Sequence, residues 1–189
     1  MPLMRSRIIC AIKCGIKLKI MFATLQEKLT NRLANLLGAI ACAGLMGYAL
    51  YAQEFLDLAP CPLCVFQRLG VIVTGVIFLL AAIHGPGVAG RRIYAALIVL
   101  ATGAGGFVAG RHVWLQGLPP EDVPACGPGL DFMINTFPLA DVLEMVFTGS
   151  GECAEIDWVF LGLSMPAWVL IAFIMLAIYG IWANLARLR

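Results

Sequence analysis

Apolar residues run along this chain in four long stretches that are separated by shorter, more polar segments. The stretches cover about residues 33–52, 65–84, 93–113 and 165–184. Each comes close to the roughly 20 residues that a helix needs to cross a hydrocarbon core about 30 Å thick. Aromatic residues such as Tyr51, Trp114 and Trp168 stand near their ends, as in interfacial belts. The pattern predicts an all-α membrane protein, a bundle of four transmembrane helices.

Composition supports a membrane location and a single domain. Of the 189 residues, 61% are hydrophobic and 13% are charged, against roughly 45–50% and 25% in soluble domains. No linker divides residues 33–184, which we expect to form one transmembrane domain. The first apolar stretch follows a basic segment, but it is longer than the core of a signal peptide and lacks a small-x-small cleavage site. We therefore expect an uncleaved first helix.

The distribution of charge predicts the orientation, because cytoplasmic segments retain Lys and Arg. The basic residues on one side of the predicted membrane are Arg5, Arg7, Lys13, Lys17, Lys19, Lys28, Arg32, Arg91, Arg92, Arg187 and Arg189. The loops on the other side, residues 53–64 and 114–164, hold every acidic residue except Glu27 and no Lys or Arg. We expect an arm (1–32) and a tail (185–189) in the cytoplasm, both loops outside, and no binding of nucleic acid.

The second outer loop is long enough to have a function of its own. Within it, Leu139, Val142, Leu143 and Val146 follow the spacing of one helix face. This predicts a short amphipathic helix. Its apolar face either lies on the membrane surface or packs on the ends of the spans.

The predicted topology sorts the seven cysteines. The four on the outer side are Cys61, Cys64, Cys126 and Cys153, and these are the disulfide candidates because the outer compartment is oxidising. Cys10 and Cys14 fall in the cytoplasmic arm, and Cys42 falls inside the first span, where we expect a packing role. Four cysteines allow three pairings, of which Cys61 with Cys64 and Cys126 with Cys153 is the simplest.

The start of the second helix gives Cys64 a particular setting. Pro62 suits the first helical position, which leaves Cys61 near the N-cap and Cys64 near the third position. A helix N-terminus favours anions and would stabilise a thiolate at Cys64. Arg68 follows one turn later on the same face. An arginine on the acidic side of a span is either a side chain that reaches the interface or a functional group, and we favour function.

A polar and aromatic group at the outer end of the third span lies at the same depth. It comprises Arg111, His112, Trp114 and Gln116. Together with Cys64 and Arg68 these side chains could line a site for a quinone headgroup.

Two other interpretations of the cysteines remain. Structural zinc usually takes two closely spaced ligand pairs, whereas Cys126 and Cys153 are far apart in the sequence, so we expect no metal. Purely structural disulfides are a stronger rival, since closing the Cys126–Cys153 loop would contribute roughly 3 to 4 kcal/mol. That rival leaves the setting of Cys64 unexplained.

These residues resemble the disulfide bond formation protein B family (DsbB), the quinone-dependent oxidases of the periplasmic dithiol oxidase DsbA. The resemblance covers the chain from about residue 31. Its most specific parts are Cys61-x-x-Cys64 with Arg68, and the segment from Gly151-Glu-Cys-Ala-Glu to Phe160-Leu-Gly-Leu-Ser-Met-Pro-Ala-Trp168. Pro62 departs from the Cys-Val-Leu-Cys that is frequent in the family.

The resemblance implies a bacterial inner-membrane thiol oxidase. It places a quinone-proximal pair at Cys61 and Cys64 and a DsbA-facing pair at Cys126 and Cys153. The cofactor would be ubiquinone or menaquinone, and the residues implied beside it are Arg68, His112 and Met165. A relative of vitamin K epoxide reductase, which works in the opposite direction, is the rival enzyme class, but the paired cysteines and the added redox domain usual in that class are not evident.

Overall fold

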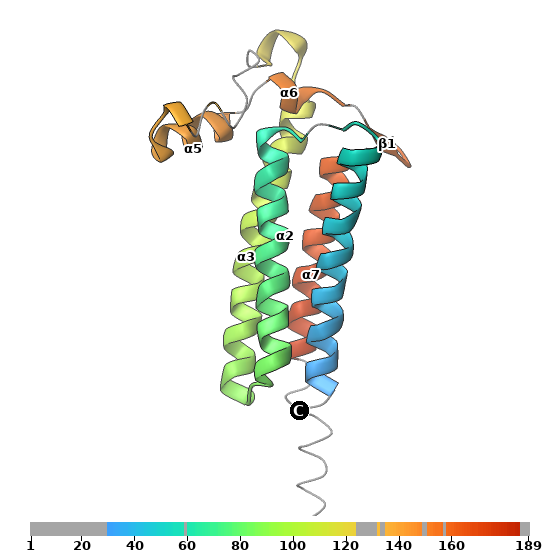
Figure 1. Cartoon of the computed structure of the whole chain (residues 1–189), viewed down its shortest axis with the longest axis vertical. Coiled ribbons are helices and arrows are strands. Elements are labelled where there is room, and N and C mark those ends of the chain that lie inside the picture. The colour runs from blue at the N-terminus through green and yellow to red at the C-terminus, as the bar shows by residue number, and fades with distance from the viewer. Residues whose placement is uncertain are drawn as a thin grey trace, which may run out of the picture.

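Four long helices stand side by side and form the body of the molecule (Figure 1). They are the first span (Thr30–Phe55), α2 (Pro62–His84), α3 (Val88–Gln116) and α7 (Met165–Leu185). All four are long and apolar enough to cross a membrane. The predicted fold class, an all-α membrane protein with four spans, is confirmed.

This computed structural model describes residues 30–58, 60–123, 132, 135–148, 151–156 and 158–185. Most of the predicted cytoplasmic arm, Cys10, Cys14, Cys126 and the end of the tail lie outside the described residues.

Three helices pack closely around the ring of Phe173. This side chain of α7 is 1% exposed and lies against Gly70 of α2 and Gly105 of α3. A Cβ atom at Gly70 would come 3.1 Å from the Cα of Gly105, and one at Gly105 would overlap the Phe173 ring. Small residues allow such approaches between membrane helices. Gly70, Gly105 and Phe173 therefore determine how closely α2, α3 and α7 approach one another where they cross.

Buried amides join the first span to α7 at the end of the bundle remote from the loops. Asn31 donates to the carbonyl of Ala183 at 2.9 Å, and Asn184 donates to Oδ1 of Asn35 at 3.0 Å. Each of these asparagines is at most 1% exposed. Because their polar groups are paired with one another, burial in an apolar bundle is tolerated.

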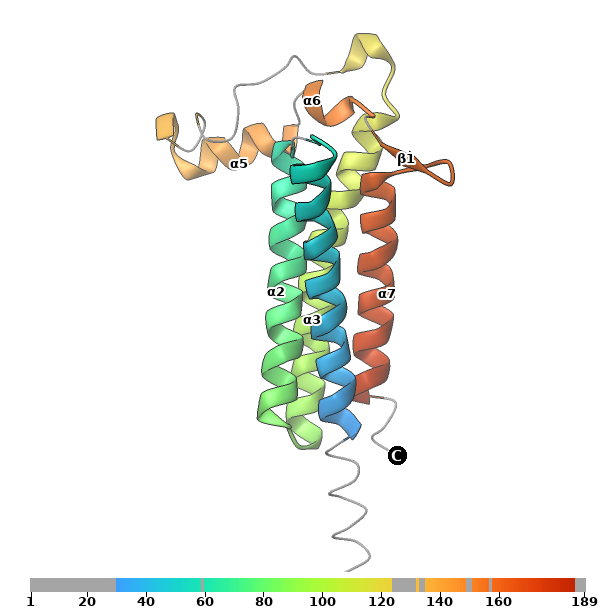
Figure 2. The same cartoon turned by 45° about the vertical axis from the view of Figure 1, so that its right-hand side comes forward.

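Short elements cover the other end of the bundle (Figure 2). They are η1 (Pro120–Asp122), α5 (Leu139–Thr148), α6 (Gly151–Ala154) and a hairpin of β1 (Val159–Phe160) and β2 (Leu163–Ser164). The predicted amphipathic helix is confirmed as α5, which extends sideways from the loop end of α2 (Figure 1). Val142 and Val146 are each 2% exposed and pack against α2 and α3 residues, so this part of its apolar face packs on the bundle.

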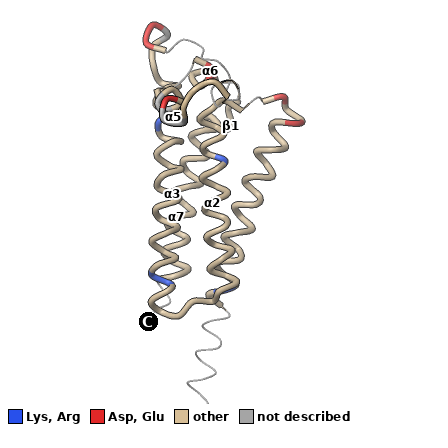
Figure 3. Tube along the Cα trace, turned by 60° about the vertical axis from the view of Figure 1, so that its left-hand side comes forward, with Lys and Arg blue, Asp and Glu red and all other residues tan. Residues whose placement is uncertain are grey.

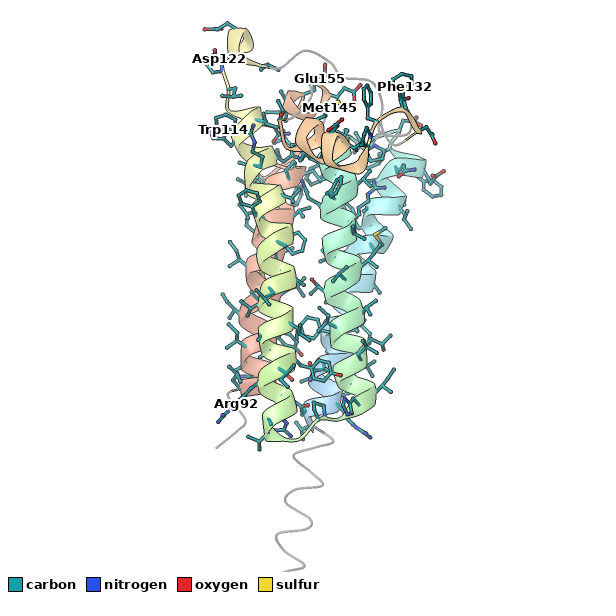
Figure 4. All side chains as sticks on the ribbon, turned by 90° about the vertical axis from the view of Figure 1, so that its left-hand side faces the viewer. Arg92, Trp114, Asp122, Phe132, Met145 and Glu155 are labelled. Atoms are coloured by element: carbon teal, nitrogen blue, oxygen red, sulfur yellow. The ribbon has the colours of Figure 1, made fainter. Side chains whose placement is uncertain are left out.

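Charged residues are unevenly distributed along the bundle, and of the described Arg residues only Arg68 and Arg111 lie toward the loop end (Figure 3). The described Asp and Glu residues gather at the end that carries α5 and α6. Arg92 lies at the opposite end of α3 from Trp114, and Glu155 lies at the loop end (Figure 4). The separation that the sequence predicts along the chain is thus a separation in space.

Candidate functional site

Helix α2 begins where the sequence predicts it. Pro62 is its first residue and Cys61 is its N-cap, whose Sγ accepts a hydrogen bond from the backbone N–H of Cys64 at 3.4 Å. The Sγ atoms of Cys61 and Cys64 are 3.2 Å apart, with both cysteines as thiols. The helix start therefore holds the two sulfurs in contact and presents Cys64 to the field of the helix N-terminus.

Helix α6 brings Cys153 to this pair. The sulfurs of Cys61 and Cys153 and a ring nitrogen of His112 all lie within 4.8 Å of one another. Cys61 is 8% exposed and Cys153 is 1% exposed, in a hydrophobic cluster that α5 closes with Val142 and Val146. Three of the four predicted redox cysteines thus meet in one site, in which Cys61 and Cys153 are buried and Cys64 is partly buried, while Cys126 is outside the described residues.

His112 faces this cluster from α3. Its Nε2 lies 3.9 Å from the Sγ of Cys61, and its Nδ1 lies 2.9 Å from the side-chain nitrogen of Gln67 on α2. His112 is 3% exposed and Gln67 is 4% exposed. Both ring nitrogens are therefore in contact with protein groups inside the bundle.

Arg68 extends toward the first span. Its guanidinium donates to Oε1 of Gln53 at 2.5 Å and to the carbonyl of Ala49 at 3.2 Å. The sequence places Arg68 one turn after Cys64 on the same helix face. The hydrogen bonds that the structure shows for Arg68 tie it to the first span, and Arg68 and Cys64 share the wall of a cavity.

That cavity has a volume of about 310 Å³ and lies among the first span, α2, α3 and α7. Its wall is mostly apolar and aromatic. The predicted site residues in its wall are Cys61, Cys64, Arg68, His112 and Met165. Further polar side chains in the wall are those of Gln67, Gln116, Glu152 and Glu155. A concave, apolar site of about 300 Å³ or more with few polar groups is typical of small-molecule binding. Of the predicted site residues that the structure describes, all except Cys153 therefore line one space.

The polar group predicted at the end of α3 divides into two parts. Gln116 lines the cavity, accepts a hydrogen bond from Ser164 at 2.6 Å and donates to the carbonyl of Glu155 at 3.3 Å. Arg111 instead stacks over the ring of Trp114 at 4.1 Å and donates to the carbonyl of Thr148. Arg111 and Trp114 therefore tether the loop, outside the cavity wall.

Two site residues are missed by the sequence analysis. Gln53 holds Arg68, and Gln67 holds His112. The available signal is that Gln67 and Arg68 are adjacent polar residues in an otherwise apolar helix, where polar side chains face the bundle interior. The sulfurs of Cys61 and Cys153 with His112 also offer three metal-ligand atoms, and the same proximity suits thiol–disulfide exchange.

Comparison with known proteins identifies the family. The model of the family described as "Disulfide bond formation protein DsbB" matches residues 31–183. The chain belongs to the DsbB family. Disulfide bond formation protein B of Hahella chejuensis is 50% identical over 155 residues, covering 82% of this chain and 93% of that protein. The proteins of the same name from Nitrosococcus oceani (48% identical, 82% and 92% covered) and Methylococcus capsulatus (50%, 82% and 96%) are similar over the same extent.

Membership of the DsbB family makes this a disulfide bond formation protein, which is an oxidoreductase role. Its four apolar helices fit a multi-pass membrane protein. The resemblance that the sequence shows to the DsbB family is confirmed.

Proposed function

We propose that this protein reoxidises a DsbA-like dithiol oxidase of the periplasm and passes the electrons to a membrane quinone. The observation that supports this proposal most is a continuous series of contacts from the long loop to the cavity. Cys153 of the long loop lies beside Cys61, Cys61 contacts Cys64, and Cys64 lines the cavity among the spans. Electrons from a soluble partner would follow this path.

Thiolate attack on disulfides gives the order of steps. A thiolate of the reduced partner attacks Cys126 in a Cys126–Cys153 disulfide, which releases Cys153 as a thiolate. Cys153 then attacks Cys61 in the Cys61–Cys64 disulfide, and Cys64 leaves as a thiolate. The partner's second thiol releases the oxidised partner from Cys126. Cys126 re-forms its bond to Cys153, and Cys61 leaves as a thiolate beside Cys64.

The relay also requires an acceptor for two electrons, and the cavity could bind one. A quinone supplies this chemistry, because it takes up two electrons and two protons from a dithiol and leaves a Cys61–Cys64 disulfide. The apolar wall suits its ring and tail, and Arg68, held by Gln53, would provide a hydrogen-bond donor near Cys64. Met165 would pack against the ring. Ubiquinone and menaquinone both satisfy this description.

Energetics favour an acceptor of this kind. A partner as oxidising as DsbA, at about −120 mV, is not reoxidised by a glutathione pool near −200 mV, given that 30 mV corresponds to roughly 1.4 kcal/mol. A lipid-soluble oxidant would also explain why the thiol site sits at the end of a membrane bundle.

The orientation that this function needs agrees with the charge pattern. The acidic loop end would face the periplasm of a bacterial inner membrane, and both termini would lie in the cytoplasm. Figure 3 shows the described acidic residues at the end that carries α6, the helix of Cys153. A partner with a basic rim around its redox site would be attracted to this end, over a range of about 8 Å at physiological salt.

The test is reduction of ubiquinone-1 by reduced DsbA with the purified protein. We expect turnover by the wild type and its loss in Cys64→Ser and in Cys126→Ser. Cys42→Ser, which removes a thiol inside the first span, is the matched control and should keep full activity. Full turnover in both of the first two variants would contradict the relay. Two purely structural disulfides, in contrast, predict no electron transfer from the wild type to quinone.

A further inference from the structure

We propose that His112 acts on the thiol side of the relay: Gln67 fixes its proton on Nε2, and this N–H stabilises the thiolate of Cys61 during exchange with Cys153. The proposal rests on the proposed function. It gives the histidine a task separate from contact with the quinone, and it gives Gln67 a positioning role.

The tautomer follows from the contact between Gln67 and His112. A side-chain amide nitrogen only donates hydrogen bonds, and that of Gln67 lies 2.9 Å from Nδ1 of His112. Nδ1 must then accept, so the proton of the neutral ring is on Nε2. Gln67 and His112 are both almost fully buried, which removes water as a competing partner.

The protonated nitrogen points at the exchanging sulfurs. Nε2 lies 3.9 Å from the Sγ of Cys61, and Cys153 lies in the same group of atoms, all within 4.8 Å. The Sγ of Cys61 also accepts from the backbone N–H of Cys64 at 3.4 Å. Two N–H groups are therefore directed at one sulfur from different helices.

This arrangement matters when Cys61 is the leaving group. As Cys126 attacks Cys153, the Cys61–Cys153 bond breaks and its electron pair remains on the Sγ of Cys61. Donors that are already oriented stabilise charge that develops in a buried site. His112 acts in this step as a hydrogen-bond donor, and no proton is transferred. The thiolate of Cys61 is then ready to re-form the bond to Cys64.

The same contacts limit what His112 can offer to a ligand in the cavity. Nδ1 is occupied by Gln67 and Nε2 by Cys61, so the ring contributes its carbon atoms to the wall. Arg68 and Gln116 also line the cavity, and their side chains carry hydrogen-bond donors that a headgroup could use.

The first experiment determines the tautomer directly. The chain has two histidines, so nitrogen NMR of histidine-labelled protein in detergent gives two sets of signals, and His84→Gln assigns them. We expect His112 of the reduced wild type to carry its proton on Nε2, and Gln67→Met to yield a mixture of tautomers. A wild-type ring protonated on Nδ1 would overturn the proposal.

The second experiment measures the exchange without quinone. In a Cys64→Ser background the protein has two disulfide states. In the starting state Cys61 is bonded to Cys153, and in the product Cys126 is bonded to Cys153 and Cys61 is free. A jump from acid, where exchange stops, to mildly alkaline pH starts the release of Cys61, which acid quenching and peptide mapping follow. We expect His112→Phe and Gln67→Met to slow this release about tenfold, as for loss of a hydrogen bond to a charged group. His112→Gln, which restores an amide donor, should recover most of the rate.

Steady-state kinetics separate this role from quinone binding. With the cysteines intact, His112→Phe and Gln67→Met should lower kcat while leaving the KM for ubiquinone-1 within about twofold. Unchanged release of Cys61 in both variants, or a rise in the quinone KM alone, would refute the proposal. If the wild type reduced no quinone, the proposed function would fail, but the tautomer and the release rates would still decide the role of His112.

Discussion

The sulfur of Cys153 lies within 4.8 Å of the sulfur of Cys61, although the two residues come from different loops. Helix α5 makes this possible, because Val142 and Val146 pack in the same cluster and hold the loop down on the ends of α2 and α3. The thiol site is therefore assembled by the packing of a loop on a helix start.

The proximity of Cys61 and Cys153 predicts a selective cross-link. In a variant that keeps only these two cysteines, mild oxidation should join them, because their sulfurs lie within 4.8 Å of each other and a shift of the short helix α6 could bring them to the S–S distance of about 2 Å. A variant that keeps only Cys42 and Cys153 is the control. Cys42 packs with Phe78 in a separate cluster, and we expect no intramolecular bridge there. Peptide mapping without reductant shows which cysteines are joined. Equal cross-linking in both variants would contradict the proximity of Cys61 and Cys153.

Arg68 and Arg111 form a second matched comparison. Both lie near the loop end, but Arg68 lines the cavity, whereas Arg111 stacks on Trp114. Arg68→Met should raise the KM for ubiquinone-1 about tenfold or more, as expected when a charged hydrogen-bond donor is lost, and change the KM for DsbA less. Arg111→Met should leave the quinone KM within about twofold. A similar rise in both variants would mean that the effect comes from charge at this depth and not from the cavity.

The sequence predicts the four spans, the start of α2 and α5, because each depends on a local pattern. Pro62 alone is enough to place Cys61 at the N-cap. The contact between Gln67 and His112 is different, since helices that are apolar nearly all round show no face from which their rotation can be read. For the same reason the pairing of Asn35 with Asn184 could not be predicted.

The sequence also does not predict whether the apolar face of α5 lies on the membrane surface or packs on the ends of the spans. Its apolar face suits a membrane surface and a protein surface equally, because both remove it from water. Only the shape of the α2 and α3 ends decides that Val142 and Val146 pack beside Cys61.

Two glycines of α3 test the crossing of the helices. Gly105→Ala should lower the free energy of unfolding by about 1 to 3 kcal/mol, because its Cβ would overlap the Phe173 ring. Gly103→Ala adds the same methyl group where no other atom lies within 4 Å, and it should be neutral or slightly stabilising. Combining Gly105→Ala with Phe173→Leu should recover part of the loss. Unfolding in mixed micelles measures all three, and equal stability of the two single variants would disprove the close approach.

The cover that α5 gives to the thiols predicts their reactivity. Val146 is 2% exposed and packs with Cys61 and Cys153, so Val146→Asp would bury a carboxylate at a cost of several kcal/mol unless the helix lifts. We expect α5 to move away from the bundle in this variant. The reduced Cys61 and Cys153 should then react about tenfold faster with a water-soluble maleimide. Thr148→Asp adds the same charge to an exposed position of α5 and should leave the rate within about twofold. Mass spectrometry of labelled peptides assigns each cysteine. Labelling of Cys42, which α5 does not cover, should not change, and a parallel rise there would indicate general unfolding instead of an opened cover.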